Sequence, residues 1–155
     1  MKIYLASRFR TLPAVLALKA KLNAAGHQVV STWHDNEALH PIPFDSPEHA
    51  DSSKHSAKRD IHELDMAECF IVLTSDCEST PGGLWFEMGV AYNLGIRIIV
   101  FGPLINVFCF LSEDAEELMD HVETEEACLE TVAREAINVA AEDAAFEEWK
   151  RQANL

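Results

Sequence analysis

Lys2-Ile3-Tyr4-Leu5-Ala6, a short apolar run near the amino terminus, is the stretch that decides the fold. A polar turn over residues 7–11 follows it, and apolar residues then recur with helical spacing from Leu12 to Ala25. Gly26 predicts the end of this helix, and residues 27–32 predict a second strand. A strand, a helix and a strand in this order form a right-handed crossover, which predicts a parallel sheet with helices on both faces.

Capping residues and prolines set the predicted bounds of the elements around this unit. Thr11 is expected to cap the first helix, with Pro13 in its first turn. From Trp33 to Ser53 the chain has three prolines and no sustained period, so this segment is predicted to be a long loop. Helical character resumes over residues 56–68. Loops of this length in a compact domain are usually functional or disordered.

A second apolar run, Cys69-Phe70-Ile71-Val72-Leu73-Thr74, is typical of a buried central strand. The remaining predicted elements continue the alternation of strand and helix: a turn over 75–83, a helix over 84–94 ended by Gly95, a strand over 96–101, a fifth strand over 118–122, and a helix capped by Thr124 that runs to about Arg151. The sequence therefore predicts one doubly wound α/β domain over residues 1–155, with a parallel sheet of about five strands.

Composition and charge narrow the class of protein. The chain has 155 residues, 48% of them hydrophobic and 25% charged, and no apolar run approaches the roughly 20 residues that cross a bilayer. Residues 1–6 read directly into a strand and lack the features of a signal peptide, so we expect a cytoplasmic protein without a membrane partner. The formal net charge of −14 would repel a phosphate backbone, which argues against a nucleic-acid polymer as partner.

Cysteine and histidine spacing gives no sign of a metal site. The four cysteines form no CxxC pair and are expected to be reduced. Four histidines are separated by six, nine and six residues, which matches no standard metal site: His34, His40, His49 and His55. No dinucleotide, P-loop or serine-hydrolase motif is present, and no cofactor is expected.

In open parallel sheets, ligands bind where the loops that follow the strands converge. This rule selects the loops over residues 7–11, from Trp33 onward and over 75–83, and it places Glu87 close behind the third loop. Gly82 and Gly83 there allow a ligand to approach the backbone closely, and apolar neighbours can shield Glu87 from water. The alternative is a surface glutamate that complements the helix dipole.

These segments, taken in order, resemble the nucleoside 2-deoxyribosyltransferase family and its N-glycohydrolase relatives. The resemblance spans most of the chain and rests on the following residues: Ile3-Tyr4-Leu5-Ala6 with Ser7-Arg8-Phe9, Arg59-Asp60-Ile61 before an apolar strand, Gly82-Gly83, Glu87-Met88-Gly89 with Ala91, Gly95, and Asn106. The resemblance implies a flavodoxin-like fold and a homo-oligomer. It also implies that Glu87 is the nucleophile, that Tyr4 orients Glu87, that Asp60 contacts the base or assists its departure, and that Asn106 helps to bind the sugar.

The chemistry asks for these groups independently. Cleavage of a C1′–N bond builds positive charge that a carboxylate such as Glu87 can stabilise or capture, and the departing base needs a proton or a hydrogen bond. Asp60 is a candidate donor, with Asp65 and Glu68 as competing carboxylates and an exposed helix residue as the alternative interpretation. Tyr4 is either an orienting phenol or plain core.

Other residues are candidates for substrate binding. Ser7, Arg8 and Arg10 suit a 5′-phosphate, although surface arginines are an equal alternative; Phe9 belongs to the same loop. Trp33 either stacks on a base or packs in the core.

Two departures from the family leave the reaction open. Trp85 stands where many members have a small residue, and Pro81 stands where transferases often have Asp and nucleotide hydrolases often have Ser. Three hypotheses follow: transfer of the sugar to a second base, transfer to water, or a nucleotide sensor without catalysis. In each of them the partner is a small nucleoside or nucleotide.

Overall fold

The computed structural model describes residues 1–35, 47–75, 82–113 and 118–153. Its five strands are β1 (Lys2–Ala6), β2 (Gln28–Val29), β3 (Cys69–Leu73), β4 (Arg97–Phe101) and β5 (Met119–Val122). They form one sheet in the order β2-β1-β3-β4-β5, and every neighbouring pair is parallel. This is the doubly wound, flavodoxin-like order, so the predicted fold class is confirmed.

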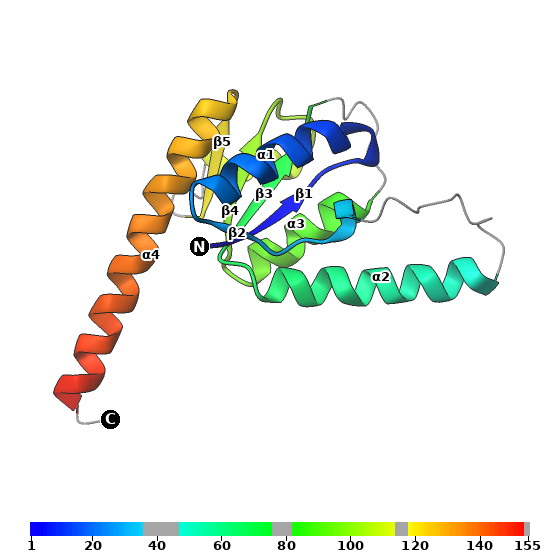
Figure 1. Cartoon of the computed structure of the whole chain (residues 1–155). Coiled ribbons are helices and arrows are strands. Elements are labelled where there is room, and N and C mark those ends of the chain that lie inside the picture. The colour runs from blue at the N-terminus through cyan, green and yellow to red at the C-terminus, as the bar shows by residue number, and fades with distance from the viewer. Residues whose placement is uncertain (36–46, 76–81, 114–117, 154–155) are drawn as a thin grey trace.

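Helices cover both faces of the sheet (Figure 1). On one face lie α1 (Leu12–Ala24) and α4 (Glu125–Ala153), joined by an ion pair between Lys21 and Glu125. On the other face α2 (Pro47–Asp65) and α3 (Gly83–Asn93) pack against each other. The change of face follows from right-handed crossovers, because the chain reverses its direction across the sheet after β2. None of the helices within the described ranges is long and apolar enough to span a membrane.

The core centres on β3, whose five residues are all buried. Residues 3–6 of β1 are equally buried beside it, and the ring of Tyr4 stacks on Phe70 with centroids 5.7 Å apart. Because both faces of these strands are covered, their sequences are continuous apolar runs and do not alternate with polar residues.

Helix α2 begins earlier than predicted. It starts at Pro47, whereas the sequence predicts a loop as far as Ser53 and a helix from about residue 56. The first turns are rich in Ser, His and Asp, and residues 50–55 are exposed, so they carry no apolar period that marks them as helical. Of the predicted loop, Trp33–Asp35 forms a short 3-10 turn, and residues 36–46 lie outside the described part of the chain.

Thr11 does not cap α1. Its hydroxyl donates to the carbonyl of Arg8 at 2.7 Å and lies 2.5 Å from Ser7 Oγ, so it closes the 3-10 turn η1 (Phe9–Thr11) that precedes the helix. Pro13 lies in the first turn of α1, as predicted. The polar turn predicted over residues 7–11 contains this 3-10 turn, and α1 starts at Leu12 as predicted.

The second strand is shorter than the predicted segment 27–32. Val30 still donates to the carbonyl of Ile3 at 2.9 Å, but the next amide of β1, that of Leu5, donates to the Ser31 hydroxyl at 3.0 Å. A side chain therefore takes the place of the backbone ladder and ends β2. The last helix starts as predicted, because Thr124 Oγ1 accepts from the amide of Ala127 at 3.1 Å.

Candidate active site

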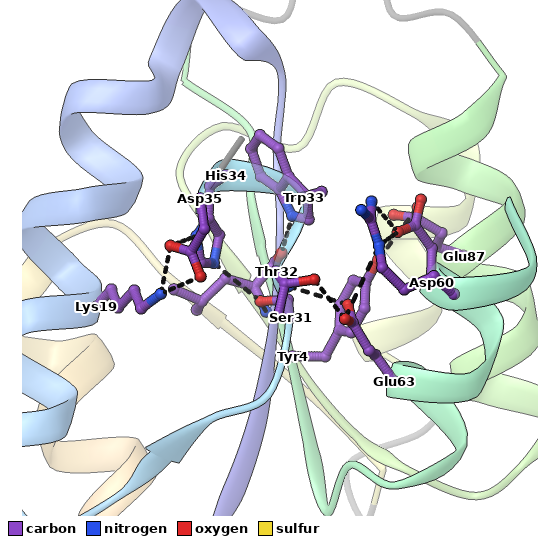
Figure 2. A network of polar contacts seen from close by, with 12 residues as sticks. Tyr4, Lys19, Ser31, Thr32, Trp33, His34, Asp35, Asp60, Glu63 and Glu87 are labelled. Atoms are coloured by element: carbon purple, nitrogen blue, oxygen red, sulfur yellow. Dashed lines mark hydrogen bonds and ion pairs between the residues drawn. The ribbon is translucent and has the colours of Figure 1, made fainter. Parts of the chain in front are cut away.

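Three side chains from three elements converge on the α2/α3 face of the sheet. Tyr4 comes from β1, Asp60 from α2 and Glu87 from α3, and Figure 2 shows them pointing toward one another. The Tyr4 hydroxyl donates to Glu87 Oε1 at 3.4 Å. Residues that lie up to 83 positions apart in the chain thus form one polar group inside a largely apolar layer.

Glu87 is a largely buried carboxyl group. Burial raises its pKa to about 7, the negative charge of Asp60 acts in the same direction, and the hydrogen bond from Tyr4 opposes both. Glu87 is therefore close to half ionised at neutral pH. The alternative of a solvated surface glutamate does not hold, since the side chain points between Tyr4 and Asp60 (Figure 2).

Tyr4 is fully buried and stacked on Phe70, yet it carries a hydroxyl that needs a partner. Burial raises the pKa of this phenol far above its ordinary value, and the negative charges of Glu87, Asp60 and Glu63 raise it further. Tyr4 therefore stays protonated and acts as a hydrogen-bond donor toward Glu87.

Asp60 is held by the residue before it. The guanidinium of Arg59 donates to Asp60 Oδ1 through Nη2 at 2.9 Å and through Nε at 3.2 Å. The competing carboxylates lie elsewhere: Asp65 is exposed, and Glu68 accepts from the amide of Lys2 at 2.6 Å. Among the acidic residues from 60 to 68 that the sequence singled out, Asp60 is the one beside Glu87.

Glu63 is a functional candidate that the sequence analysis missed. Its carboxylate is buried and accepts from the Thr32 amide at 2.9 Å and from the Thr32 hydroxyl at 2.5 Å, and Arg59 Nε lies 3.9 Å away. This Thr32–Glu63 clasp fixes α2 to the chain that leaves β2, and so it fixes the place of Asp60, one turn earlier on the same helix. Glu63 was recognisable only as an acidic residue one turn after Asp60.

The loop after β1 is tied to the neighbouring strand. Ser7 Oγ donates to the carbonyl of Leu73 at the end of β3, at 3.0 Å, and contacts Thr11. Arg8 contributes its backbone carbonyl to the same turn. Phe9 is 58% exposed and meets the ring of Trp33 edge-on, with centroids 5.5 Å apart.

Trp33 packs in the core at this edge of the sheet. Its indole Nε1 donates to the carbonyl of Leu5 at 2.6 Å, and 9% of the residue is exposed. The structure therefore favours the packing interpretation of Trp33 and leaves the exposed ring of Phe9 as the more accessible aromatic surface.

A second polar network lies behind Trp33. Ser31 Oγ is 3.2 Å from His34 Nε2, His34 Nδ1 is 3.0 Å from Asp35 Oδ1, and Lys19 pairs with Asp35 at 2.6 Å (Figure 2). Burial lowers the pKa of His34. Ser31 is fully buried and already accepts from the Leu5 amide, so this network ties α1 to the chain after β2 and offers no nucleophile. In the described ranges, no group of three His, Cys, Asp or Glu side chains has a metal-binding arrangement.

The remaining predicted residues lie at or beyond the ends of α3. Gly82 and Gly83 form its amino-terminal end, where a Cβ would meet nothing within 4 Å, and residues 76–81, with Pro81, are outside the described chain. Asn106 Oδ1 accepts from the amide of Phe108 at 3.0 Å and starts the 3-10 helix η3 (Val107–Glu113), which the sequence did not predict. None of the contacts described for Asn106 reaches Tyr4, Asp60 or Glu87.

Trp85 lies on another side of α3 from the polar group. With Met88, Tyr92, Phe108 and other residues it lines an apolar pocket of about 280 Å³ between α3 and η3. Its side chain thus shapes this pocket.

Three solved structures are similar to this chain over most of its length. A 2-deoxyribosyltransferase from the psychrotolerant bacterium Bacillus psychrosaccharolyticus is 25% identical, with a TM-score of 0.60 over 83% of this chain and 90% of that one. The CMP N-glycosidase BcmB from Clostridium botulinum is 15% identical, with a TM-score of 0.54 over 86% and 99%. A conserved protein from Enterococcus faecalis V583 is 18% identical, with a TM-score of 0.61 over 87% and 98%.

The class that fold and site define is thus a flavodoxin-like α/β protein with a carboxylate and a phenol at the sheet. The neighbour that is 25% identical is a 2-deoxyribosyltransferase, so the resemblance predicted from the sequence is confirmed, and the CMP N-glycosidase shares the fold. No family model matches the chain, and no curated protein does.

Proposed function

We propose that the protein cleaves the N-glycosidic bond of a deoxynucleoside or nucleoside, or of its 5′-monophosphate, and transfers the sugar to a second base. The observation that carries this proposal is the partly buried hydrogen bond from Tyr4 to Glu87, with Asp60 beside them. The similarity to a 2-deoxyribosyltransferase supports it.

In the proposed first step, an oxygen of ionised Glu87 bonds to C1′ of the sugar. The C1′–N bond breaks, its electron pair leaves with the base, and Asp60 assists the base by a hydrogen bond or a proton. In the second step a nitrogen of the incoming base attacks C1′, the bond between C1′ and Glu87 breaks and restores the carboxylate, and the proton of that nitrogen passes to Asp60, the group that assisted the departing base. Tyr4 holds the nucleophile in position through its hydroxyl.

The other predicted site residues keep their proposed roles. Ser7, Arg8 and Phe9 lie on the loop after β1 and would contact the sugar or its 5′-phosphate, and Gly82 and Gly83 would let the substrate approach the start of α3. Asn106 would bind the sugar only if η3 or a second subunit brings it to Glu87. Trp33 would support Phe9 through the edge-on contact between their rings, because the Trp33 side chain is itself packed in the core.

Hydrolysis is the second candidate reaction, with water in place of the incoming base. The fold shared with a CMP N-glycosidase supports it. A cytoplasmic location, one domain over residues 1–155 and a homo-oligomer complete the proposal.

The test is chromatography of purified protein incubated with deoxynucleosides, nucleosides and their 5′-monophosphates, with and without a second free base. Exchange of the base supports the transferase, and release of free sugar without exchange supports the hydrolase. Glu87→Gln should abolish either activity, whereas Asp65→Asn, an exposed change on α2, should leave it intact. Nucleotide binding with no turnover by the wild-type protein would favour a sensor and contradict the proposal.

The covalent step has its own test. Rapidly quenched wild-type protein, analysed by intact mass spectrometry in the absence of an acceptor base, should carry the mass of one sugar residue, and the label should map to the peptide that contains Glu87. Turnover with no labelled species, even with a slow fluorinated sugar, would exclude the glycosyl-enzyme route.

A further inference from the structure

The last helix extends far beyond the sheet that it covers. Its first half packs on the sheet through Cys128, Val132 and Glu135, all buried. Glu135 is the last of these anchors: it lies 3.6 Å from Arg97, the first residue of β4, and pairs with Arg134 at 3.1 Å. From there α4 continues past the amino ends of the strands (Figure 1). We call residues 137–153 the arm; at 1.5 Å per residue it is about 25 Å long.

The arm has an apolar face that continues the packed face of the same helix. The buried positions 128, 132 and 135 are spaced by four and three residues, and the same spacing leads on to Val139, Glu142, Phe146, Trp149 and Ala153. Such a repeat places all these side chains on one side of a helix. The helix therefore presents to solvent the side that it elsewhere buries.

Two large aromatic residues mark this face. Phe146 is 53% exposed and Trp149 is 54% exposed, and their rings stack with centroids 5.7 Å apart. From Phe146 onward the side-chain contacts described are with residues of the arm itself, such as Lys150 with Glu147 and with the Phe146 ring. A free helix of this length is marginal in water, and exposed aromatic surface of this kind usually marks an interface.

The charges of the arm indicate the partner. Glu142 and Asp143 precede Phe146, and after it come Lys150 and Arg151, which pair within the arm with Glu147 and Glu148. If two arms cross antiparallel around a two-fold axis at Phe146, residues four before it lie opposite residues four after it. Glu142 then faces Lys150 of the second copy, and Val139 faces Ala153. A parallel pair would place like charges together. The arm is thus complementary to itself in one orientation.

We propose that the arm is a self-association surface, on which a second copy of this chain docks its own arm antiparallel, with Phe146 and Trp149 as the central contacts. The interface consists mainly of half-exposed aromatic rings and is small, so the dimer forms reversibly with concentration. The arm lies at the amino ends of the strands, away from the loops that follow them (Figure 1).

The test is sedimentation velocity of the full chain without substrate, from about 1 µM to about 1 mM, the range in which small interfaces dissociate. The wild-type protein should shift from monomer to dimer. Phe146→Ser with Trp149→Ser should raise the dissociation constant about tenfold or more. Ile137→Ser is the matched control: Ile137 is 71% exposed and lies on the opposite side of the helix, so its loss should leave the dimer unchanged.

Charge exchange tests the orientation. Glu142→Lys with Asp143→Lys should weaken the dimer, and so should Lys150→Glu with Arg151→Glu. The four changes together should restore it when Glu147→Lys and Glu148→Lys are added, because the pairs across an antiparallel crossing are then re-formed and the ion pairs within the arm are kept. Circular dichroism checks that each variant stays helical.

Three results would overturn the proposal: a monomer over the whole concentration range, a dimer that survives loss of both aromatic rings, or dissociation by Ile137→Ser as large as that by the aromatic changes. A dimer that the complete charge exchange, with the pairs inside the arm kept, fails to restore would overturn the antiparallel arrangement.

Discussion

At the scale of single residues, Glu87 links stability to pH. Its pKa is about 7 in the folded protein, against 4.5 for an ordinary glutamate. The folded chain therefore binds more protons than the unfolded chain between these values, and the stability that this group contributes falls as the pH rises through them. Well below pH 4.5 the group is neutral in both states.

Replacing Glu87 by Gln removes this buried charge. We expect the variant to be more stable than the wild-type protein at pH 8, by up to about 3 kcal/mol, and equal to it at about pH 3.5. Urea unfolding at a series of pH values measures the difference. The same change at Glu130, an exposed position on α4, should give no such slope. A wild-type protein that is the more stable of the two at pH 8 would show that Glu87 is not a strained carboxylate.

Tyr4→Phe removes the hydroxyl that stabilises ionised Glu87. Because this hydrogen bond lowers the pKa of Glu87, its loss should move the acid limb of the pH profile of kcat/KM to higher pH. We expect about a tenfold loss of activity at neutral pH, the effect of one hydrogen bond to a charged group. Tyr92→Phe, which changes the second of the two tyrosines, should alter neither the limb nor the rate.

The resemblance singled out Tyr4, Asp60 and Glu87 in the sequence, and the structure brings these three side chains together. The sequence was not sufficient to name Glu63. The hydrogen bonds from Thr32 to Glu63 join residues 31 positions apart, and no local pattern distinguishes this glutamate from its exposed neighbours. The sequence also could not decide whether Trp33 stacks on a base or packs in the core. Its packing depends on a hydrogen bond to the carbonyl of Leu5, which lies 28 positions earlier in the chain.

At the scale of elements, the Thr32–Glu63 clasp holds α2 in place. Thr32→Val should destabilise the protein by about 1–3 kcal/mol, because it removes one donor from a buried carboxylate. Thr32→Ser keeps the hydroxyl and should restore most of the loss. Thermal unfolding of the three proteins measures the effect. Equal stability of the Val variant and the wild-type protein would mean that the clasp does not support the helix.

The position after β4 accepts only glycine without strain. Gly102 has φ +114°, and a Cβ there would lie 2.7 Å from Thr74 Oγ1 at the end of β3. Gly102→Ala should therefore cost more than about 1 kcal/mol of stability. Gly89→Ala is the contrasting control, since it lies inside α3 with open space around it and should stabilise the helix by about 0.5–1 kcal/mol. Chemical denaturation measures both changes in the free energy of unfolding, a loss for Gly102→Ala and a gain for Gly89→Ala.

Strands and helices were predictable where burial imposes a pattern. The apolar run of β3 and the turn residues around α3 defined those elements nearly to the residue. The start of α2 and the early end of β2 were not predictable. The first turns of α2 bury no apolar side, and β2 ends because the Ser31 hydroxyl substitutes for a ladder hydrogen bond.

At the scale of the whole molecule, the structure has a packed part and an extended part. The part of α4 before Glu135 packs on the sheet, so its amide hydrogen bonds are protected by tertiary contacts. The amide hydrogen bonds of the arm are protected by the helix alone. In dilute protein we expect hydrogen exchange to be faster by about a hundredfold or more in residues 137–153 than in β3 and β4. Mass spectrometry of peptides from a labelled sample resolves these regions. Uniform protection along α4 at low concentration would contradict this division.

The topology also determines when the protein can become functional during its synthesis. Ile3 pairs with Cys69 in the sheet, so the first strand stays without its central neighbour until β3 has been made. The hydrogen bond between Tyr4 and Glu87 can form only after α3 has been made, because Glu87 lies 83 positions after Tyr4. Contacts over such separations close large loops and form slowly. A nascent chain that has left the ribosome only as far as α2 contains β2 but not β3, so one edge of the apolar strand β1 has no partner strand. We expect this interval to be the one in which the protein most needs a chaperone.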